Sequence, residues 1–248
     1  MMSEKLETTA FWIKVGTYGV TKVSPAISKM KKLAKKGEDL KCNILASETV
    51  QKWSAYCIKA GNWKVSVHGI EKIPTDRPVL FVPNHQSYGD IPILLHALKD
   101  FRIGFVIRET MAKLPFINQL VDHMRCVPIN VYDVRKSAQA LNQTIDNIKA
   151  GYSMVIFPEG RRTFSNIPEK FKNGAFKIAK KTGVTIVPIY LHNVHRAFEG
   201  NAHVLGHPHI TVSVLDPIDT SNMSRSDVST LNERVYESIL DCSRKFNN

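Results

Sequence analysis

The stretch Val79–Asp90, VLFVPNHQSYGD, passes from an apolar run directly into a polar turn. Its first four residues are typical of a buried strand, and Pro83 is expected to end that strand. A helix is expected to begin near Asp90, with Pro92 in its first turn. His85 therefore lies just beyond the carboxyl end of a strand, which is where open α/β sheets bind their ligands.

Other short apolar runs along the chain resemble the first, and helical patterns lie between several of them. The strands that we predict are Lys64–Val67, Val79–Val82, Ile103–Ile107, Cys126–Ile129, Met154–Phe157, Thr185–Leu191 and Ile210–Val214. The predicted helices are Ile91–Leu98, Lys136–Ala150, Gly174–Lys181 and Ser226–Phe246. This alternation predicts a single α/β domain, residues 62–248, with a mainly parallel sheet covered by helices.

Residues 1–61 have a different pattern, which predicts an amphipathic two-helix motif. One helical face is expected to contain Trp12, Val15, Gly19, Val23, Ile27, Met30 and Leu33, at intervals of three or four. Pro25 is expected to kink this helix, and Gly37 to end it. The second helix is predicted over Glu38–Ala60, with Leu40, Ile44, Leu45, Trp53 and Cys57 facing inward.

The charge of the chain is strongly basic, with 34 Lys+Arg against 22 Asp+Glu and a net charge of +12. Such a chain is attracted to polyanions: nucleic acid, anionic lipid or phosphorylated substrates. Residues 1–60 contain eleven Lys and no Arg against five acidic residues, a net charge of +6. Lysines beside an apolar helix face are typical of a helix in the membrane interface. The alternative is a hairpin that packs on the core with its lysines in solvent.

The cysteines and the N-terminus limit the compartment and the class of site. The four Cys are scattered with no C-x-x-C, which argues against structural zinc and fits a reduced, cytoplasmic location. We expect no secretory signal, because Glu4, Glu7 and Lys14 interrupt the first apolar residues. We also expect no spanning helix, because no run of about 18 uncharged apolar residues exists.

His85 and Asp90 form the first candidate site. Asp90 can accept a hydrogen bond from one imidazole nitrogen and leave the other as a base, as in the His-Asp half of a catalytic triad. The alternatives are a turn histidine and a helix N-cap aspartate. Ser87 is a conceivable nucleophile, but it lies two residues from His85 in the same turn and is poorly placed to transfer its proton.

A second strand with a polar end, MVIFPEGRRT (Met154–Thr163), delivers Glu159, Gly160 and Arg162 into a turn. The planar guanidinium of Arg matches phosphate, so this turn predicts an anion clamp; the alternative is a solvated surface turn. Arg108 follows a third strand in the same way. Pro188, within TIVPIYL, is expected to mark a bulge or a sheet edge. The chain contains no G-x-S-x-G, P-loop or H-E-x-x-H motif.

Together these stretches resemble the glycerolipid acyltransferase superfamily, most closely the 1-acyl-glycerol-3-phosphate (lysophosphatidic acid) acyltransferases. The matching motifs, in the order of that family, are N-H-x-S-x-x-D (Asn84, His85, Ser87, Asp90), Arg108 before Lys113-Leu114-Pro115, F-P-E-G (Phe157–Gly160) with Arg162 and Thr163, and V-P-I (Val187–Ile189). The stretch FKNGA is also similar to the family. Arg161 departs from the pattern, because Thr or Ser is usual there.

The resemblance implies roles for these residues. His85, oriented by Asp90, would take the proton from the free glycerol hydroxyl, whose oxygen would attack an acyl thioester directly. Arg108 and Arg162 would hold the substrate phosphate, and Glu159 would position them or the glycerol. Asn84, Ser87 and Gly160 would complete the substrate-binding set, and Arg161 is expected to be exposed. No metal and no cofactor is implied beyond the co-substrate, an acyl-acyl carrier protein or acyl-coenzyme A.

The implied acceptor is lysophosphatidic acid, which lies in the bilayer. We therefore expect peripheral, monotopic association of residues 1–60 with the anionic cytoplasmic face of the cell membrane. Alternative acceptors are glycerol-3-phosphate, a lyso-aminolipid and a lipid A precursor. Two other classes are a Ser/His hydrolase and a basic nucleic-acid-binding module; the second is disfavoured because the basic residues of the first region are all Lys beside an apolar helix face. The sequence leaves open the donor, the acyl-chain length and the oligomeric state.

Overall fold

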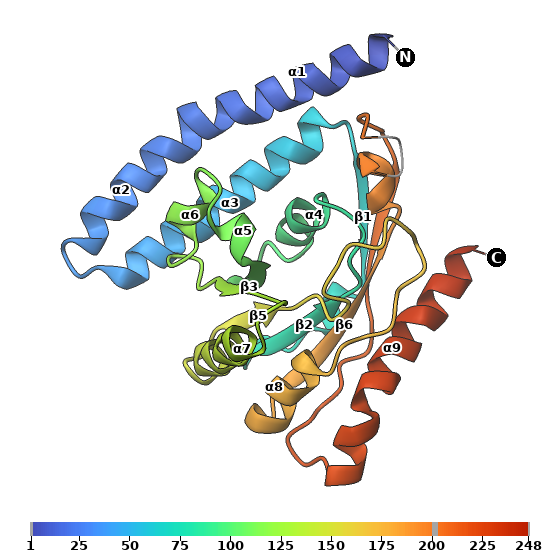
Figure 1. Ribbon diagram of the computed structural model, residues 1–248. Coiled ribbons are helices and arrows are strands. Elements are labelled where there is room, and N and C mark those ends of the chain that lie inside the picture. Colours follow the sequence, from blue (N-terminus) through green and yellow to red (C-terminus); the bar gives the residue numbers. More distant parts are fainter. Residues whose placement is uncertain (1, 200–202, 248) are drawn as a thin grey trace.

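The fold is built around a seven-stranded sheet with the strand order β1-β7-β6-β2-β5-β3-β4 (Figure 1). The computed structural model describes residues 2–199 and 203–247. The predicted range 1–61 also includes Met1, and the predicted range 62–248 also includes residues 200–202 and Asn248; these lie outside the described residues. The strands are β1 (Lys64–His68), β2 (Val79–Pro83), β3 (Ile103–Arg108), β4 (Val127–Ile129), β5 (Ser153–Val155), β6 (Thr185–His192) and β7 (His209–Val214).

Neighbouring strands are parallel except for β6 and β7, which pair antiparallel. Side chains alternate between the two faces of each strand, as the period of two requires. In β2, Val79 and Phe81 belong to one hydrophobic core, whereas Leu80 and Val82 belong to the other. The sheet is therefore apolar on both faces, and each face needs a covering layer of helices.

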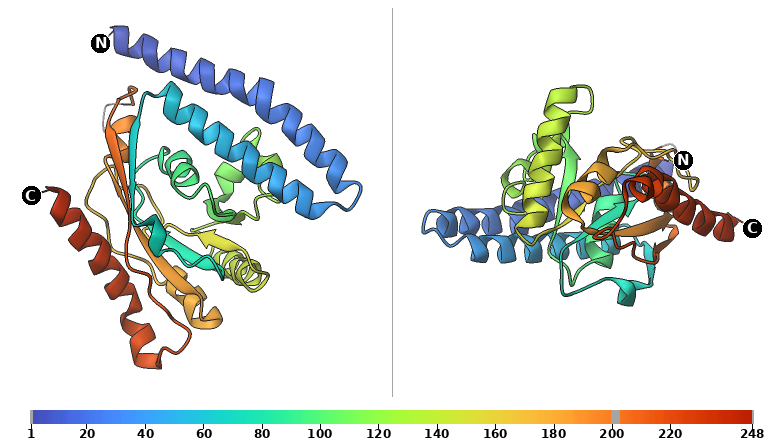
Figure 2. Two further views of the ribbon diagram at one scale, coloured as in Figure 1. Left: turned by 180° about the vertical axis from the view of Figure 1, so that it is seen from behind. Right: turned by 90° about the horizontal axis from the view of Figure 1, so that it is seen from below.

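Helices cover the two faces (Figures 1 and 2). The first face is covered by α4 (Asp90–Ala97), α5 (Glu109–Ala112) and α6 (Ile117–Leu120), with α3 (Asp39–Ala60) packed outside α4. The second is covered by α7 (Val134–Lys149), α8 (Gly174–Thr182) and α9 (Arg225–Asn247). Short η helices lie at Gly19–Val23, Ile70–Lys72 and Val194–Ala197.

The predicted single α/β domain with a mainly parallel sheet is confirmed, and each predicted strand and helix is present within a few residues. The short helices α5 and α6 were not predicted. The expectation of an edge at Pro188 is wrong, because β6 lies inside the sheet. A bulge does exist, but on the opposite segment: Ile189 pairs with Val214 whereas Ile186 pairs with Ile218, which leaves one extra residue after β7.

The predicted N-terminal helices form a hairpin of α1 (Met2–Tyr18), η1, α2 (Ser24–Ala34) and α3. Pro25 was predicted to kink the first helix, and a π-helical turn lies just before it, in which the Ser24 N–H donates to the Gly19 carbonyl; the kink itself stays a prediction. The inward orientation predicted for Leu40 and Ile44 is wrong, since both are exposed, and Trp12 of the predicted apolar face of the first helix is exposed as well.

An aromatic cluster joins α1 to the body of the protein. The ring of Phe11 lies 5.7 Å from that of Trp63 and 5.3 Å from that of Phe198, and Trp12 stacks on Phe198 at 5.4 Å between centroids. Phe11 is buried in the same core as the strands. The hairpin and the α/β part thus share one hydrophobic core. The domain boundary at residue 61 stays a prediction.

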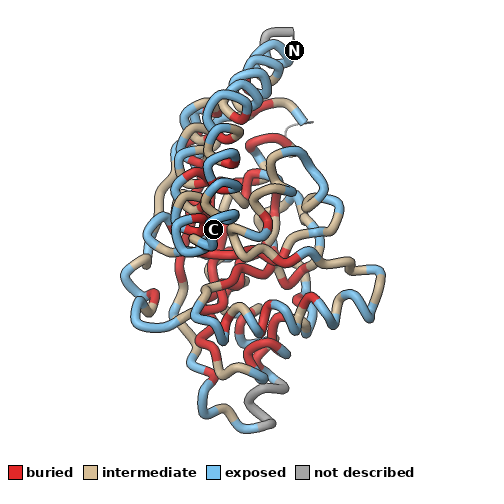
Figure 3. The backbone as a smooth tube through the Cα atoms, turned by 90° about the vertical axis from the view of Figure 1, so that its left-hand side faces the viewer, coloured by how far each residue is buried: buried red, intermediate tan, exposed pale blue. Residues whose placement is uncertain are grey.

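The outer side of the hairpin faces away from the sheet. Figure 3 shows exposed residues along the hairpin and buried ones concentrated in the interior. Within the described residues, no helix combines the length and apolar character that crossing a membrane would need.

Candidate active site

Three adjacent strands deliver the predicted site residues to one edge of the sheet. β2 lies beside β5, and β5 lies beside β3, all parallel, so their carboxyl ends meet. His85 follows β2, Arg108 ends β3, and the turn Glu159–Arg162 follows β5. Residues that are 23 to 77 positions apart in sequence thus become neighbours, as expected for a site at the carboxyl ends of parallel strands.

His85 is bonded to Asp90 across the turn. The distance between His85 Nδ1 and Asp90 Oδ2 is 2.6 Å. Asp90 Oδ2 also accepts the backbone N–H of Gln86 at 2.7 Å and of Ser87 at 3.0 Å. These bonds close the turn on the residues before α4, so Asp90 orients the imidazole and is not the N-cap of α4.

Asp90 is completely buried. Burial raises the pKa of its carboxyl group, while the bond to His85 and the two N–H groups act in the opposite direction. An anionic Asp90 favours a proton on Nδ1 of His85, which leaves Nε2 as the nitrogen with a free lone pair. Nε2 makes no hydrogen bond to the part of the chain that the structure describes.

The segment after β5, Phe157–Thr163, contacts both the imidazole ring and the backbone of His85. Its imidazole stacks on Phe157 with 4.1 Å between ring centroids. Its backbone N–H donates to Glu159 Oε1 at 2.7 Å, and its carbonyl accepts from the N–H of Thr163 at 2.8 Å and from the Thr163 hydroxyl at 3.1 Å. The turns after β2 and β5 therefore fix each other, and His85 is positioned from its ring and from its backbone.

Glu159 is buried beneath the site. Its Oε1 accepts from His85 and its Oε2 accepts the backbone N–H of Glu169 at 3.0 Å. Burial raises the pKa of Glu159 to about 8, against the effect of these two hydrogen bonds. Glu159 thus links the backbone at His85 to the backbone at Glu169, and its side chain is shielded from solvent.

The two predicted arginines lie in different settings. The Arg108 Nη2 donates to the Gly160 carbonyl at 2.8 Å, and Arg108 is exposed. Gly160 has a φ of +71°, a left-handed conformation that favours glycine. Arg162 is only 26% exposed; its Nη1 lies 3.0 Å from Glu199 Oε1 and its guanidinium lies over the Tyr88 ring at 3.7 Å.

Asn84 and Arg161, the next two residues singled out in the sequence, form hydrogen bonds to other residues of the chain. Asn84 is buried, and its amide donates to the Leu191 carbonyl at 3.1 Å and accepts the Leu191 N–H at 2.7 Å, which ties the loop to β6. Arg161 is exposed, as predicted, and forms a bidentate pair with Glu169 at 2.7 and 2.8 Å. Substrate contact by Asn84 stays a prediction.

Glu199 is the site residue that the sequence analysis missed. Its carboxylate is 2% exposed and accepts from Ser87 Oγ at 2.6 Å, from the Tyr88 N–H at 3.0 Å and from Arg162 at 3.0 Å. It therefore joins the turn after β2 to the turn after β5. One signal existed: Glu199 is the lone acidic residue between Glu169 and Asp216.

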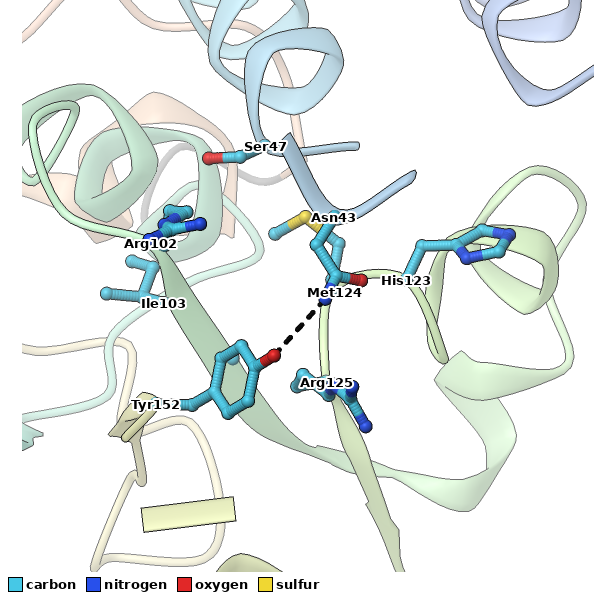
Figure 4. A pocket seen from close by; sticks show the side chains of 9 residues that line it. Asn43, Ser47, Arg102, Ile103, His123, Met124, Arg125 and Tyr152 are labelled. Atoms are coloured by element: carbon cyan, nitrogen blue, oxygen red, sulfur yellow. Dashed lines mark hydrogen bonds between the residues drawn. The ribbon is translucent and has the colours of Figure 1, made fainter. Parts of the chain in front are cut away.

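A separate pocket lies at the opposite edge of the sheet, at the amino ends of β3 and β5. It is lined by Asn43, Ser47, Arg102, Ile103, Gly104, His123, Met124, Arg125 and Tyr152. Figure 4 shows the Asn43–Tyr152 hydrogen bond across it. No cluster of His, Cys, Asp or Glu that could hold a metal ion exists among the described residues.

We predict that Glu199→Ala lowers the free energy of unfolding by about 3 kcal/mol, because it leaves Arg162 and the Ser87 hydroxyl without a buried partner. The matched control is Glu169→Ala, which breaks the exposed pair with Arg161 and is expected to cost less than about 1 kcal/mol. Urea unfolding of both variants measures the difference. Equal losses would contradict the interlocking role of Glu199.

The raised pKa of Glu159 predicts a dependence of stability on pH. In the folded protein the acid stays protonated up to about pH 8, whereas its ordinary pKa is 4.5, so the unfolded chain loses the proton first. Glu159 thus makes the wild type less stable as the pH rises from about 4.5 to 8. We expect the stability of Glu159→Gln relative to wild type to increase across this window, measured by urea unfolding at several pH values. A difference that does not change with pH would refute it.

Comparison with known proteins shows the family to which the chain belongs. Residues 64–192 match the model of the Acyltransferase family, just over half of the chain. A 1-acyl-sn-glycerol-3-phosphate acyltransferase of Borreliella burgdorferi is 31% identical over 190 residues, which cover 74% of this chain and 75% of that protein. The chloroplastic LPAT1 of Arabidopsis thaliana, also described as a 1-acyl-sn-glycerol-3-phosphate acyltransferase, is 34% identical over 161 residues.

The match with the plant protein covers 64% of this chain but only 45% of the plant protein, so the chain spans less than half of that relative. The crystal structure of the 1-acyl-sn-glycerophosphate (LPA) acyltransferase PlsC from Thermotoga maritima has the same fold, with a TM-score of 0.82, 23% identity, and coverage of 99% of this chain and 97% of that one. The match of more than half of the chain to the family model shows that this protein belongs to the Acyltransferase family.

Proposed function

We propose that the protein transfers a fatty acyl group from an acyl thioester to the free hydroxyl of lysophosphatidic acid, giving phosphatidic acid. The observation that carries the proposal is the His85–Asp90 pair, set 2.6 Å apart beside a turn rich in arginine. The relatives from Borreliella burgdorferi and Arabidopsis thaliana, whose names state this activity, support it.

The proposed step is a direct attack. His85 Nε2 takes the proton of the acceptor hydroxyl while the hydroxyl oxygen bonds to the thioester carbonyl carbon. The tetrahedral intermediate then collapses, the C–S bond breaks, and the leaving thiolate receives the proton from His85. Asp90 stabilises the imidazolium that exists between these two transfers. No covalent acyl-enzyme forms.

The setting of Ser87 supports acyl transfer over hydrolysis through a serine nucleophile. Its hydroxyl donates to Glu199 at 2.6 Å and accepts the Gly89 N–H at 3.0 Å. A serine nucleophile would need its hydroxyl to be hydrogen-bonded to the imidazole, which acts as its base. We therefore assign Ser87 to shaping the loop, together with Asn84.

The arginines are proposed to hold the acceptor phosphate. Arg108 is exposed at the site edge, and the part of the Arg162 guanidinium not used by Glu199 remains for a ligand. Both carriers of the acyl group, acyl carrier protein and coenzyme A, present the same thioester, so the proposed chemistry is common to them.

The hairpin is proposed to dock the site on an anionic membrane surface. Leu6, Ile13 and Val20 recur every seven residues on one side of the α1–η1 segment, and each is more than 60% exposed. Leu40 adds to the exposed apolar area of the hairpin from α3. Apolar residues that face solvent within a lysine-rich segment are the arrangement of an interfacial helix.

We predict that His85→Ala lowers the rate of phosphatidic acid formation at least a hundredfold, because the base is lost. The assay uses labelled lysophosphatidic acid in detergent, with each thioester donor in turn. His123→Ala, at the opposite edge of the sheet, is the matched control and is expected to keep wild-type activity. Product that survives in a folded His85→Ala variant would refute the mechanism. Wild type that acylates another acceptor instead would refute lysophosphatidic acid as substrate.

For the membrane surface, we predict that Ile13→Ser combined with Val20→Ser weakens binding to anionic vesicles by about tenfold or more, since two exposed apolar side chains no longer enter the bilayer. The matched control is Tyr132→Ser combined with Val134→Ser, an apolar pair outside the hairpin in which each residue is 87% exposed. Vesicle flotation measures both. Equal binding by the hairpin variant and wild type would exclude this docking surface.

A further inference from the structure

Two cations meet at Gly160, in the turn after β5. Arg108 donates to the Gly160 carbonyl at 2.8 Å. The Lys172 side chain lies beside the same glycine, so that a Cβ at position 160 would lie 2.9 Å from Lys172 Nζ. The backbone N–H of Lys172 donates to the Pro158 carbonyl at 2.9 Å, which anchors Lys172 to the same turn.

The other two cations of this turn are already neutralised. Arg161 is paired with Glu169, and Arg162 is paired with the buried Glu199. The formal charge of each of these pairs is zero, so neither leaves an uncompensated positive charge for a ligand.

Arg108 and Lys172 differ from those arginines. Within the described residues, no carboxylate lies within ion-pair distance of either, and both are exposed. From Lys170 to Phe198 the sequence contains no acidic residue at all. Arg108 and Lys172 therefore place beside Gly160 two positive charges without a carboxylate partner in the described chain.

Glycine is favoured at this place by its backbone conformation. Its φ of +71° is strained for residues with a side chain, whereas the nearest atoms to a Cβ here would be the end of the exposed Lys172 side chain, which can move aside. The Lys172 side chain thus lies beside the same residue that Arg108 contacts, and its backbone is fixed to the turn.

We propose that Lys172 and Arg108 together form the charge-matched half of the acceptor site, which binds a phosphate monoester dianion, and that Lys172 is a further substrate-binding residue. A phosphate monoester carries nearly two negative charges at neutral pH, because its second pKa is about 6. Two uncompensated cations balance that charge, whereas Arg162 contributes shape and hydrogen bonds from its neutralised pair. This inference rests on the proposed function for the identity of the acceptor.

The test compares Lys172→Gln with Lys177→Gln, which changes an exposed lysine on α8. The ligands are a hexanoyl lysophosphatidic acid and monohexanoylglycerol, which is the same molecule without its phosphate. Binding is measured by calorimetry without any acyl donor. We expect Lys172→Gln to raise the Kd for the phosphate-bearing ligand about tenfold, with no change for the neutral ligand. Lys172→Arg should recover most of the loss, and Lys177→Gln should match wild type.

Equal Kd values for Lys172→Gln and Lys177→Gln would overturn the proposal, as would an equal loss for both ligands. Wild-type acyl transfer, assayed separately, keeps the two hypotheses distinct. If wild type forms no phosphatidic acid but Lys172→Gln still loses phosphate-dependent binding, the proposed function fails and the anion site stands. If wild type is active, the Lys172→Gln variant should show a raised KM with little change in kcat.

Discussion

One carboxylate oxygen, Oδ2 of Asp90, fixes the geometry of the site. It accepts from the His85 imidazole at 2.6 Å and from the N–H groups of Gln86 and Ser87. A buried carboxylate is costly unless it is hydrogen-bonded, so the turn and the charge depend on each other. The second oxygen of Asp90 is buried without a hydrogen-bond partner in the described chain. All the compensation for this charge therefore comes from the bonds that hold the imidazole and its loop in place.

Carboxylates also determine what the basic residues of the site can do. Glu199 is buried and holds Arg162 against the ring of Tyr88, whereas Glu169 pairs with Arg161 at the surface. The pairing with Glu199 fixes the orientation of the Arg162 guanidinium, but it also neutralises the charge of that guanidinium. Orientation and charge are thus supplied by different residues at this edge of the sheet, and a count of arginines in the sequence does not reveal which is which.

The sequence was sufficient for the features that depend on neighbours along the chain. The strands follow from short apolar runs, and the position of His85 follows from the end of β2. It was insufficient for contacts between distant segments: Glu199 reaches the site from beyond β6, 112 residues after Ser87. Periodicity also could not separate the two apolar sides of α1. Phe11 and Trp12 are adjacent and both aromatic, and only the shape of the protein beneath α1 determines which one is buried.

The hairpin and the site are joined by short physical connections. Phe198 packs against Phe11 and Trp12 of α1, and the next residue, Glu199, binds both site turns. On α3, the Ser54 hydroxyl donates at 2.6 Å to the carbonyl of Pro92, in the first turn of α4. These contacts join the hairpin to residues on either side of the network that holds the His85 turn. Exposed apolar side chains lie among the lysines of the hairpin, and its inward side reaches these loops, so docking of the hairpin on a bilayer, as proposed, would also set the direction in which the site faces.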